Sequence, residues 1–260
     1  MKKFNLKDMT FVMPVRFDSV IRLENALVVI NYLHRHFETN IFVLEAASYC
    51  DYIFRILIKN KVRYFFLEEN DIIFHKTKYI NYLTRKINTP FISIWDADVI
   101  ADKKQIIEAI EALKNNKADV SYPYDGRFLD TSDIIRLLFL EKKHISVLHN
   151  YKYFMHLIYG DKMVGGAVFI NLEKYIKSGL DNENFYGWGN EDYERQYRFN
   201  KLGYRTYRSD GPIYHLSHPR DINGKFRSEK QYKWTSNYLK NLKSSSQDDV
   251  YNRLMNRNSL

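Results

Sequence analysis

Three carboxylates stand beside an aromatic, glycine-rich turn in the segment FYGWGNEDYER, residues 185–195. Glu191, Asp192 and Glu194 follow a tryptophan, Trp188, that lies between two glycines. Acidic side chains in a first helical turn stabilise the helix by about 0.3–1 kcal/mol each, and this accounts for Glu194 and one neighbour. It does not account for the tryptophan, which is rare in plain exposed turns. The pattern indicates a loop that places a ring against a sugar and a carboxylate against a hydroxyl.

A second acidic pair, Asp96 and Asp98, directly follows the apolar run FISIW, residues 91–95. Side chains at i and i+2 of a strand point the same way, unless a turn intervenes. Because an unpaired carboxylate is costly to take out of water, such a pair favours a divalent cation with oxygen ligands, Mg²⁺ or Mn²⁺. The alternative is a solvated turn in which Asp98 or Asp102 caps the next helix. We assign Asp102 to the cap.

Apolar runs alternate with helical patterns in the first half of the chain. Strands are expected at residues 10–15, 40–46, 62–68, 91–95 and 118–124. Asp18 or Ser19 is expected to cap the first helix, and Asp102 with Gln105 resembles a capping box. The second half predicts a strand at 165–172, a helix at 190–203 closed by Gly203, and short strands at 204–209 and 213–218. The alternation predicts an α/β fold with a mostly parallel central sheet flanked by helices, and ligands at the carboxyl ends of its strands.

The amino-acid composition limits the cellular compartments and the binding partners that suit this chain. The 260 residues include 40 basic and 31 acidic side chains, a net charge of +9, which suits nucleic acid, an anionic membrane or a phosphorylated substrate. The single cysteine, Cys50, excludes an intrachain disulfide and favours a reducing compartment. No run is long and apolar enough for a signal peptide or a membrane span. We therefore expect a cytoplasmic protein, with peripheral contact at the inner face of a membrane compatible with its charge.

The last 40 residues have a different composition from the rest. They hold eight Lys or Arg against four Asp or Glu. We expect a catalytic domain at residues 1–220 and a basic helical C-terminal extension at 221–260. The extension is interpreted either as a contact with an anionic membrane near a lipid-linked acceptor or as a solvated appendage.

The acidic loop also carries a family resemblance. GWGNEDYERQYRFNKLGYRTYR closely resembles the GWGxEDxE segment of β-1,4-galactosyltransferases and related bacterial glycosyltransferases with a GT-A fold. FVMPVR, SIWDADVI, MVGGAVFI and HPRD are similar to further family motifs, in the same order, from about Thr10 to Asp221. Three features depart from the family: Ala97 in the D-x-D, the third acid displaced to Glu194, and no counterpart of the animal enzymes' membrane anchor.

The resemblance implies a GT-A fold and a role for each acidic residue. Asp98, assisted by Asp96 through the ribose or water, would hold Mn²⁺ or Mg²⁺ on the donor diphosphate, and His218 or His215 would complete the metal shell. Asp192 would be the base that deprotonates the acceptor hydroxyl. Glu191 would hydrogen-bond sugar hydroxyls, and Trp188 would be a stacking platform. Direct attack would invert the anomeric centre.

The remaining candidates belong to the nucleotide-sugar donor. Pro14, Arg16 and Asp18 lie at the end of the first strand, and Arg16 would clamp a phosphate or a base edge. Glu45 is a weaker candidate for the base or ribose. Gly165 and Gly166 would let backbone N–H groups approach the donor. Lys78 and Asn81, on the helix before the D-x-D, are the weakest candidates for the same role.

Three other classes of function are weighed against this one. A sugar-nucleotide nucleotidyltransferase would not need the Trp188 loop, and its N-terminal glycine-rich loop is missing. Only charge favours a basic nucleic-acid-binding protein, so we expect no nucleic acid partner. A sugar-binding protein without turnover would not need both acidic clusters. The sequence thus predicts a metal-dependent inverting glycosyltransferase that moves a hexose of the galactose, N-acetylgalactosamine or glucose class. It would transfer this hexose from a UDP-sugar to a saccharide or glycolipid acceptor in bacterial surface polysaccharide synthesis.

Overall fold

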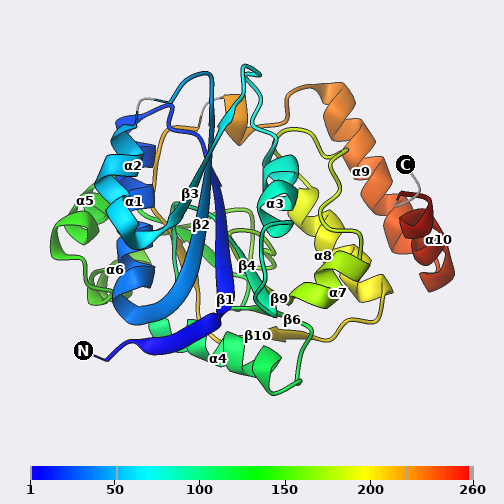
Figure 1. The fold of residues 1–260 in the computed structure, drawn as a ribbon, viewed down its shortest axis with the longest axis horizontal. Helices are drawn as coiled ribbons and strands as arrows, with labels where there is room; N and C mark the ends of the chain where they lie inside the picture. Colours follow the sequence, from blue (N-terminus) through cyan, green and yellow to red (C-terminus); the bar gives the residue numbers. More distant parts are fainter. Residues whose placement is uncertain (1, 51, 221, 258–260) are drawn as a thin grey trace.

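A seven-stranded sheet forms the centre of the protein (Figure 1). The computed structural model describes residues 2–50, 52–220 and 222–257. Across the sheet the strands run in the order β10 (Thr206–Arg208), β6 (Val120–Tyr122), β9 (Ala167–Asn171), β4 (Phe91–Trp95), β1 (Phe4–Val15), β2 (Phe37–Ala47) and β3 (Arg63–Glu68). All neighbours are parallel except β9, which lies antiparallel between β4 and β6. The predicted mostly parallel sheet is confirmed.

A four-stranded sheet joins the two halves of the chain. Its order is β5 (Val99–Ile100), β11 (Ile213–His215), β7 (Phe128–Asp130) and β8 (His156–Leu157). Because β5 directly follows the D-x-D and pairs antiparallel with β11, His215 lies opposite Val99 in the register. The backbone N–H of Leu216 also donates to the carbonyl of Asp98 at 2.8 Å. This pairing brings the late histidines to the first acidic motif.

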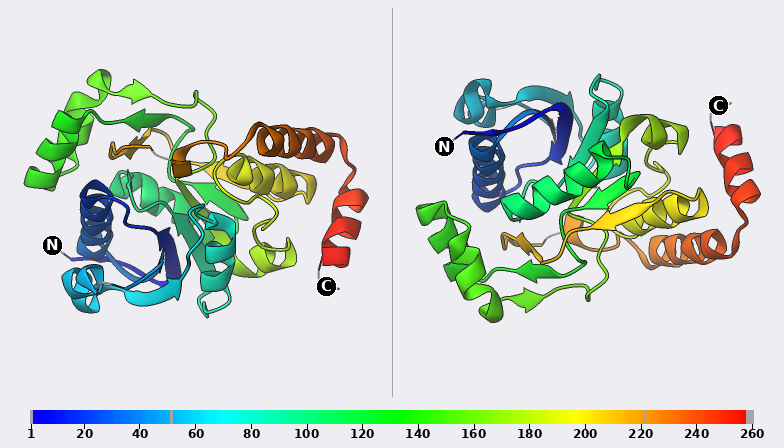
Figure 2. Two further views of the ribbon diagram at one scale, coloured as in Figure 1. Left: turned by 90° about the horizontal axis from the view of Figure 1, so that it is seen from above. Right: turned by 90° about the horizontal axis from the view of Figure 1, so that it is seen from below.

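Helices cover the sheet in groups (Figures 1 and 2). On the side of the N-terminal strands lie α1 (Val20–His36), α2 (Ile53–Ile58), η1 (Lys59–Lys61), α5 (Asp133–Lys142), α6 (Ser146–Tyr151) and η2 (Lys152–Phe154). The other side carries α3 (Lys76–Thr84), α7 (Leu172–Lys177) and α8 (Glu191–Lys201), with α4 (Lys103–Lys114) along the lower edge. The C-terminal part forms η3 (Ile222–Gly224), α9 (Glu229–Ser244) and α10 (Gln247–Arg257), and α9 packs on α8.

The structure tests the helix caps that the sequence predicts. Ser19, rather than Asp18, caps α1, because its Oγ accepts from the N–H of Arg22 at 3.4 Å. Asp102 caps α4 as expected. The prediction of a capping box is wrong. The side-chain amide of Gln105 instead donates to the carbonyls of Pro123 and Pro212 at 2.9 and 3.2 Å. Gln105 therefore ties α4 to two loops.

Helix α8 begins at Glu191, as the acidic motif predicts, and is followed by Gly203 with φ +74°. Glu194 lies in the first turn of α8, as expected, but it is buried. Its side chain is 1% exposed and pairs with the equally buried Arg198 at 3.1 Å. Arg198 also donates to the carbonyls of Ser178 and Leu180. The pair thus anchors the acidic loop's helix to the chain that precedes the loop.

The C-terminal segment is helical, as predicted, but the boundary proposed at residue 220 remains a prediction. Asp221, the last residue of the HPRD motif, lies outside the described residues. Within the described parts of the chain, no helix is both long enough and apolar enough to cross a bilayer.

Replacing Glu194 with alanine should destabilise the protein by about 3 kcal/mol, since it leaves the Arg198 guanidinium buried without its carboxylate. Chemical denaturation measures the change. Glu173→Ala is the matched control, because Glu173 forms an i,i+4 pair with Lys177 that is exposed to solvent. This control should leave the free energy of unfolding unchanged. Equal effects of the two substitutions would contradict a buried structural pair.

Candidate active site

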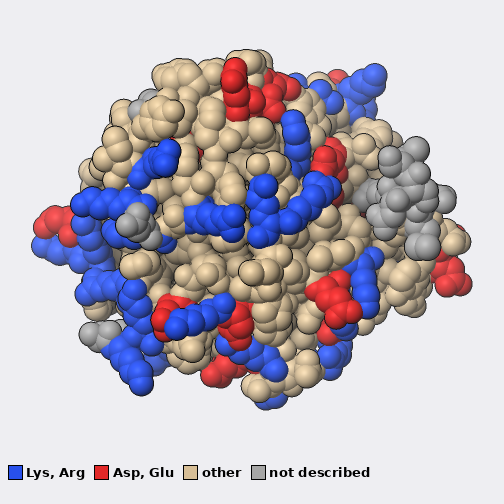
Figure 3. Space-filling view, in the orientation of Figure 1, with Lys and Arg blue, Asp and Glu red and all other residues tan. Residues whose placement is uncertain are grey.

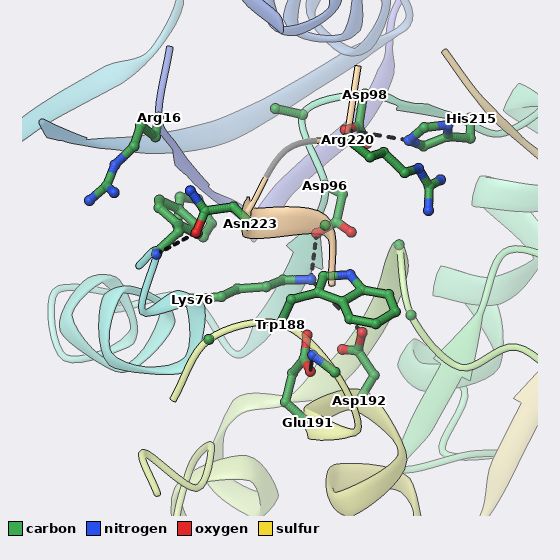
Figure 4. A pocket seen from close by; sticks show the side chains of 18 of the residues that line it. Arg16, Lys76, Asp96, Asp98, Trp188, Glu191, Asp192, His215, Arg220 and Asn223 are labelled. Carbon is green, nitrogen blue, oxygen red and sulfur yellow. Dashed lines mark hydrogen bonds and ion pairs between the residues drawn. The ribbon is translucent and has the colours of Figure 1, made fainter. Parts of the chain in front are cut away.

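A cavity of about 320 Å³ opens at the carboxyl ends of β1 and β4 (Figure 4). It is lined by residues that the sequence spreads over more than 200 positions: 14–18, 96–98, 165–166, 187–193, and the late group of His215, His218, Arg220, Asn223, Gly224 and Phe226. Both acidic motifs therefore face one cavity. This is the placement that a shared site for a cation and a hydroxyl group requires.

Asp98 and both late histidines form one cluster. Nε2 of His218 lies 3.0 Å and Nε2 of His215 lies 3.7 Å from Oδ2 of Asp98. Their ligand atoms all lie within 4.8 Å of one another. Burial opposes ionisation of Asp98, but the two histidines outweigh it and lower its pKa well below the usual range. The sequence alternatives, His215 or His218, are thus both brought to Asp98.

The second nitrogen of His215 fixes its ring. Nδ1 lies 2.7 Å from Oδ1 of Asp130, so Nε2 is directed at Asp98. Burial lowers the pKa of His215, but the carboxylates of Asp98 and Asp130 raise it to about 10. An imidazole oriented by an outer carboxylate is typical of metal ligands. One carboxylate and two imidazoles fit Mn²⁺ well, so the donor set is compatible with the metal that the sequence implies.

Asp96 does not join that cluster. Its Oδ1 lies 2.8 Å from Nζ of Lys76, the first residue of α3. The chain turns at residues 96–98 instead of continuing β4, so the two aspartates of the D-x-D meet different partners. Burial, together with the charges of Asp98 and Asp192, raises the pKa of Asp96 despite Lys76. Asp96 thus contacts Lys76 and not the Asp98 cluster. Its predicted role, which is to assist the metal through the ribose or water, remains a prediction.

Lys76 connects the two acidic motifs. Its Nζ also lies 3.8 Å from Oδ2 of Asp192, and Figure 4 shows it between the two aspartates. Burial opposes its charge, but the carboxylates of Asp192, Asp96 and Glu191 outweigh burial and raise its pKa. An ammonium group in this position reduces the repulsion among acids that share one cavity.

Asp192 is held from two further sides. Arg195, one turn later on α8, donates to its Oδ1 and pairs with the buried Asp181 at 2.8 Å. A Cβ on Gly165 would lie 2.5 Å from Oδ2 of Asp192, so only glycine leaves room for the carboxylate. Burial raises the pKa of Asp192, but Lys76 and Arg195 lower it further than burial raises it. The carboxylate is therefore ionised at neutral pH and open to the cavity.

Glu191 has the opposite electrostatic environment. Its Oε2 accepts from the N–H of Gly189 at 2.8 Å. Burial first, and then the charge of Asp192, raise its pKa to about 7, with Lys76 opposing them. Adjacent acids with pKa values pushed apart are typical of sites that handle protons.

Aromatic rings form one wall of the cavity. The ring of Trp188 lies 5.4 Å from Phe226 and 5.9 Å from Tyr159, centroid to centroid. A Cβ on Gly189 would lie 2.5 Å from the Phe226 ring, which explains the second glycine of the loop. The Arg220 guanidinium lies 5.0 Å from the Tyr159 ring centroid. Trp188 is thus part of a wall that the C-terminal segment completes.

The other end of the cavity holds the first-strand candidates. Arg16 donates from Nε to the carbonyl of Ala46 at 2.9 Å, and from Nη1 to the carbonyls of Asp71 and Ile72. Its Nη2 is buried without a hydrogen-bond partner among the described residues. Pro14 and Asp18 line the cavity beside it. Arg16 is therefore held by three backbone carbonyls and has one nitrogen without an acceptor among the described residues.

Several donor-side expectations have a different outcome. Glu45 does not line the cavity; its carboxylate accepts from the Tyr64 hydroxyl at 2.8 Å. Lys78 pairs with Glu69, and Asn81 bonds to the carbonyl of Asp181. The residue of α3 that lines the cavity is instead Lys76, the first residue of the helix. Gly166 does line the cavity, and it has φ +80°.

Sequence reasoning missed Lys76, Arg195, Arg220 and Phe226. Lys76 lies in HKTK, where the start of the helix decides which lysine turns inward. Arg195 carried a usable signal, since it follows Asp192 by three residues and so lies on the same side of α8. Phe226 contacts the loop from a remote segment, and no local pattern indicates it.

Comparison with known proteins identifies the fold. Residues 146–220 match the sequence profile of the family described as the N-terminal domain of galactosyltransferase. No curated protein sequence matches the chain. The catalytic domain of Drosophila β1,4-galactosyltransferase 7 in complex with xylobiose has a similar structure, with a TM-score of 0.51 at 16% identity, over 90% of this chain and 79% of that one.

Two further structures are similar. A variant of the Drosophila enzyme with manganese, UDP-Gal and xylobiose superimposes with a TM-score of 0.55 at 14% identity, over 89% of this chain and 79% of that one. S. aureus TarS in complex with UDP-GlcNAc reaches 0.60 at 12% identity, over 96% of this chain and 72% of that one. The predicted GT-A fold and the resemblance to these glycosyltransferases are confirmed.

Replacing Glu191 with glutamine should stabilise the protein more at about pH 8 than at about pH 5. The folded pKa, about 7, lies above the unfolded value of about 4.3. The stabilisation by the protonated carboxyl is therefore complete below the unfolded pKa and is lost as the pH rises through 7. Glutamine cannot ionise, so its advantage should grow by about 1–3 kcal/mol across this range.

Denaturant unfolding at both pH values measures this difference. Glu108→Gln, an exposed substitution on α4, is the control and should show the same small effect at both. A pH-independent effect of Glu191→Gln would show that Glu191 ionises normally.

Proposed function

We propose that this protein is a metal-dependent inverting glycosyltransferase that moves a hexose from a UDP-sugar to a saccharide hydroxyl. The observation that supports the proposal most is the joint placement of the Asp98 cluster and Asp192 in one cavity, connected through Asp96 and Lys76. The first group suits a diphosphate-bound cation, and the second suits an alcohol. The solved relatives with this fold include complexes with UDP-Gal and UDP-GlcNAc.

The donor would lie across the cavity from Arg16 to the Asp98 cluster. The free Nη2 of Arg16 would donate to the base or a phosphate, with Phe74 packed 5.5 Å from the guanidinium. Asp98, His215 and His218 would hold Mn²⁺ or Mg²⁺, which when bound supplies Lewis-acid stabilisation of the departing diphosphate. Arg220 and Lys76 would add positive charge from the protein itself.

The acceptor would enter between Trp188 and Asp192. Asp192 accepts the hydroxyl proton while the acceptor oxygen bonds to the anomeric carbon. The bond from that carbon to the diphosphate oxygen breaks, and UDP leaves with its electron pair. Because the new bond forms opposite the leaving group, the anomeric configuration inverts. Glu191 and the Trp188 ring would orient the sugar hydroxyls and the sugar face.

The biological setting is part of the proposal. Saccharide acceptors agree with the xylobiose found in the Drosophila complexes. A cytoplasmic enzyme of bacterial surface polysaccharide synthesis, acting on a saccharide or a lipid-linked acceptor, agrees with the single cysteine and the basic charge.

Replacing Asp192 with asparagine should lower kcat for transfer by about 10²–10⁴-fold, because the amide cannot accept the hydroxyl proton. Donor binding, measured by calorimetry with UDP-sugar and Mn²⁺, should change little. Asp210→Asn, an exposed substitution outside the cavity, should leave kcat unchanged. A near-normal kcat in the Asp192 variant would exclude this residue as the base.

Replacing Asp98 with alanine, or His215 or His218 with asparagine, should weaken Mn²⁺ binding by at least about tenfold, since each removes one ligand. Titration of Mn²⁺ followed by electron paramagnetic resonance measures the effect without turnover. The control is His149→Gln, at a half-exposed histidine that pairs with Asp102 outside the cavity. Unchanged Mn²⁺ affinity in all three site variants would contradict this metal site.

A further inference from the structure

Helix α2 is apolar on two opposite sides, and only one of them is covered. Phe54 and Ile58 are buried, and Phe54 packs against Phe17 at 4.6 Å. Ile56 and Leu57 face the other way and are 66% and 47% exposed. An apolar side of a helix is ordinarily covered, in a core or against a partner. The outer side of α2 is therefore apolar and yet exposed in the described structure.

Two tyrosines extend this exposed surface. Tyr49 and Tyr52, in the turn that leads into α2, are 72% and 55% exposed. Together with Ile56 and Leu57 they form what we call the α2 face. Tyrosine is enriched at membrane interfaces, where its ring lies among apolar groups and its hydroxyl stays in water. These four exposed side chains lie within nine residues of one another in the sequence. An ordinary surface carries single, scattered apolar side chains and not such a group.

Basic side chains flank the α2 face. Arg55 and Lys59 are exposed, and Lys61 is partly exposed. In the described parts of the chain none of the three pairs with a carboxylate; Lys61 donates to Oδ1 of Asn31 instead. In Figure 3 the described surface above α2 is mostly uncharged, and Lys and Arg side chains lie over α2 and below it. The surface thus combines an apolar patch with a positive border.

We propose that the α2 face docks on an anionic lipid membrane. A bilayer surface offers both complements at once, since acyl chains receive the apolar side chains and acidic headgroups attract the basic ones. A second copy of this chain is a poorer occupant, because it would bring two positive borders together in a protein of net charge +9. The proposal differs from a contact through the basic C-terminal helices.

The covered side of α2, opposite the α2 face, contacts a wall of the proposed active site. Phe17, which packs on Phe54, also lines the cavity. Docking would therefore hold the cavity near the lipid surface. If the proposed transfer is correct, this arrangement suits a lipid-linked acceptor, but the docking itself depends only on α2.

Sedimentation with vesicles tests the proposal without any assay of transfer. The full chain should bind vesicles of phosphatidylcholine mixed with phosphatidylglycerol and not vesicles of phosphatidylcholine alone. Ile56→Asn should weaken binding about tenfold, as expected for an apolar side chain kept out of the lipid. Ile176→Asn is the matched control, because Ile176 is 52% exposed on α7, another six-residue helix, and should bind as the unaltered chain does.

The charged border is tested in the same way. Arg55→Gln with Lys59→Gln should weaken binding at least about tenfold, since each basic side chain near an anionic surface contributes about fivefold. Lys230→Gln with Lys240→Gln, on α9, should leave it unchanged. Binding lost only in the α9 variant, or unaffected by Ile56→Asn, would overturn the proposal. Vesicle binding that is absent while the chain dimerises through α2 would also overturn it. Either failure leaves the proposed transfer untouched.

Discussion

The ammonium group of Lys76 is the contact on which the arrangement of the active site depends. It lies 2.8 Å from Asp96 and 3.8 Å from Asp192, and these two residues come from strands and helices almost 100 positions apart. The two motifs contribute four of the acidic side chains that line the cavity, Asp96, Asp98, Glu191 and Asp192, and their mutual repulsion would favour separation of the two motifs. A buried cation at the start of α3 holds them together. The fold serves this purpose by placing α3 between the ends of β4 and α8.

The four acidic side chains of the two motifs also differ in the direction of their pKa shifts. Asp98 is lowered in pKa by two histidines, and Asp192 by Lys76 and Arg195. Asp96 and Glu191 are raised, mainly by burial. The site thus holds two carboxylates with lowered pKa values, Asp98 and Asp192, and two with raised pKa values, Asp96 and Glu191. Under the proposed function, this difference in environment would let one cavity serve a cation at one end and a hydroxyl at the other.

Much of the fold could be predicted from the sequence because local residue patterns determine where its strands and helices begin and end. The apolar run at 91–95, the acids of α8 and the glycine after it each indicate their element directly. The capping box at Gln105 failed because a tertiary contact with two carbonyls competes with the local one. Glu194 is an acid of the first turn of α8, as expected, but its burial and its pair with Arg198 depend on what packs above the helix and had no local signal.

The site was less predictable than the fold. The resemblance indicated Asp98, Asp192, Trp188 and the histidines, and the structure brings all of them to one cavity. Lys76 reaches that cavity because of where α3 begins, and Phe226 reaches it through a contact between segments far apart in the sequence. Neither position shows in a periodic pattern of residues. The same limit applies to the exposed side of α2, because a short apolar run does not tell which of its sides is covered.

The central claim is that a donor-bound cation and the proposed base occupy one cavity. Anomalous diffraction from crystals grown with Mn²⁺ and UDP tests it most directly. The account predicts one manganese peak among Asp98, His215 and His218, with the diphosphate beside it and the uracil near Arg16. A peak elsewhere, or UDP bound outside the cavity that Asp192 faces, would contradict it.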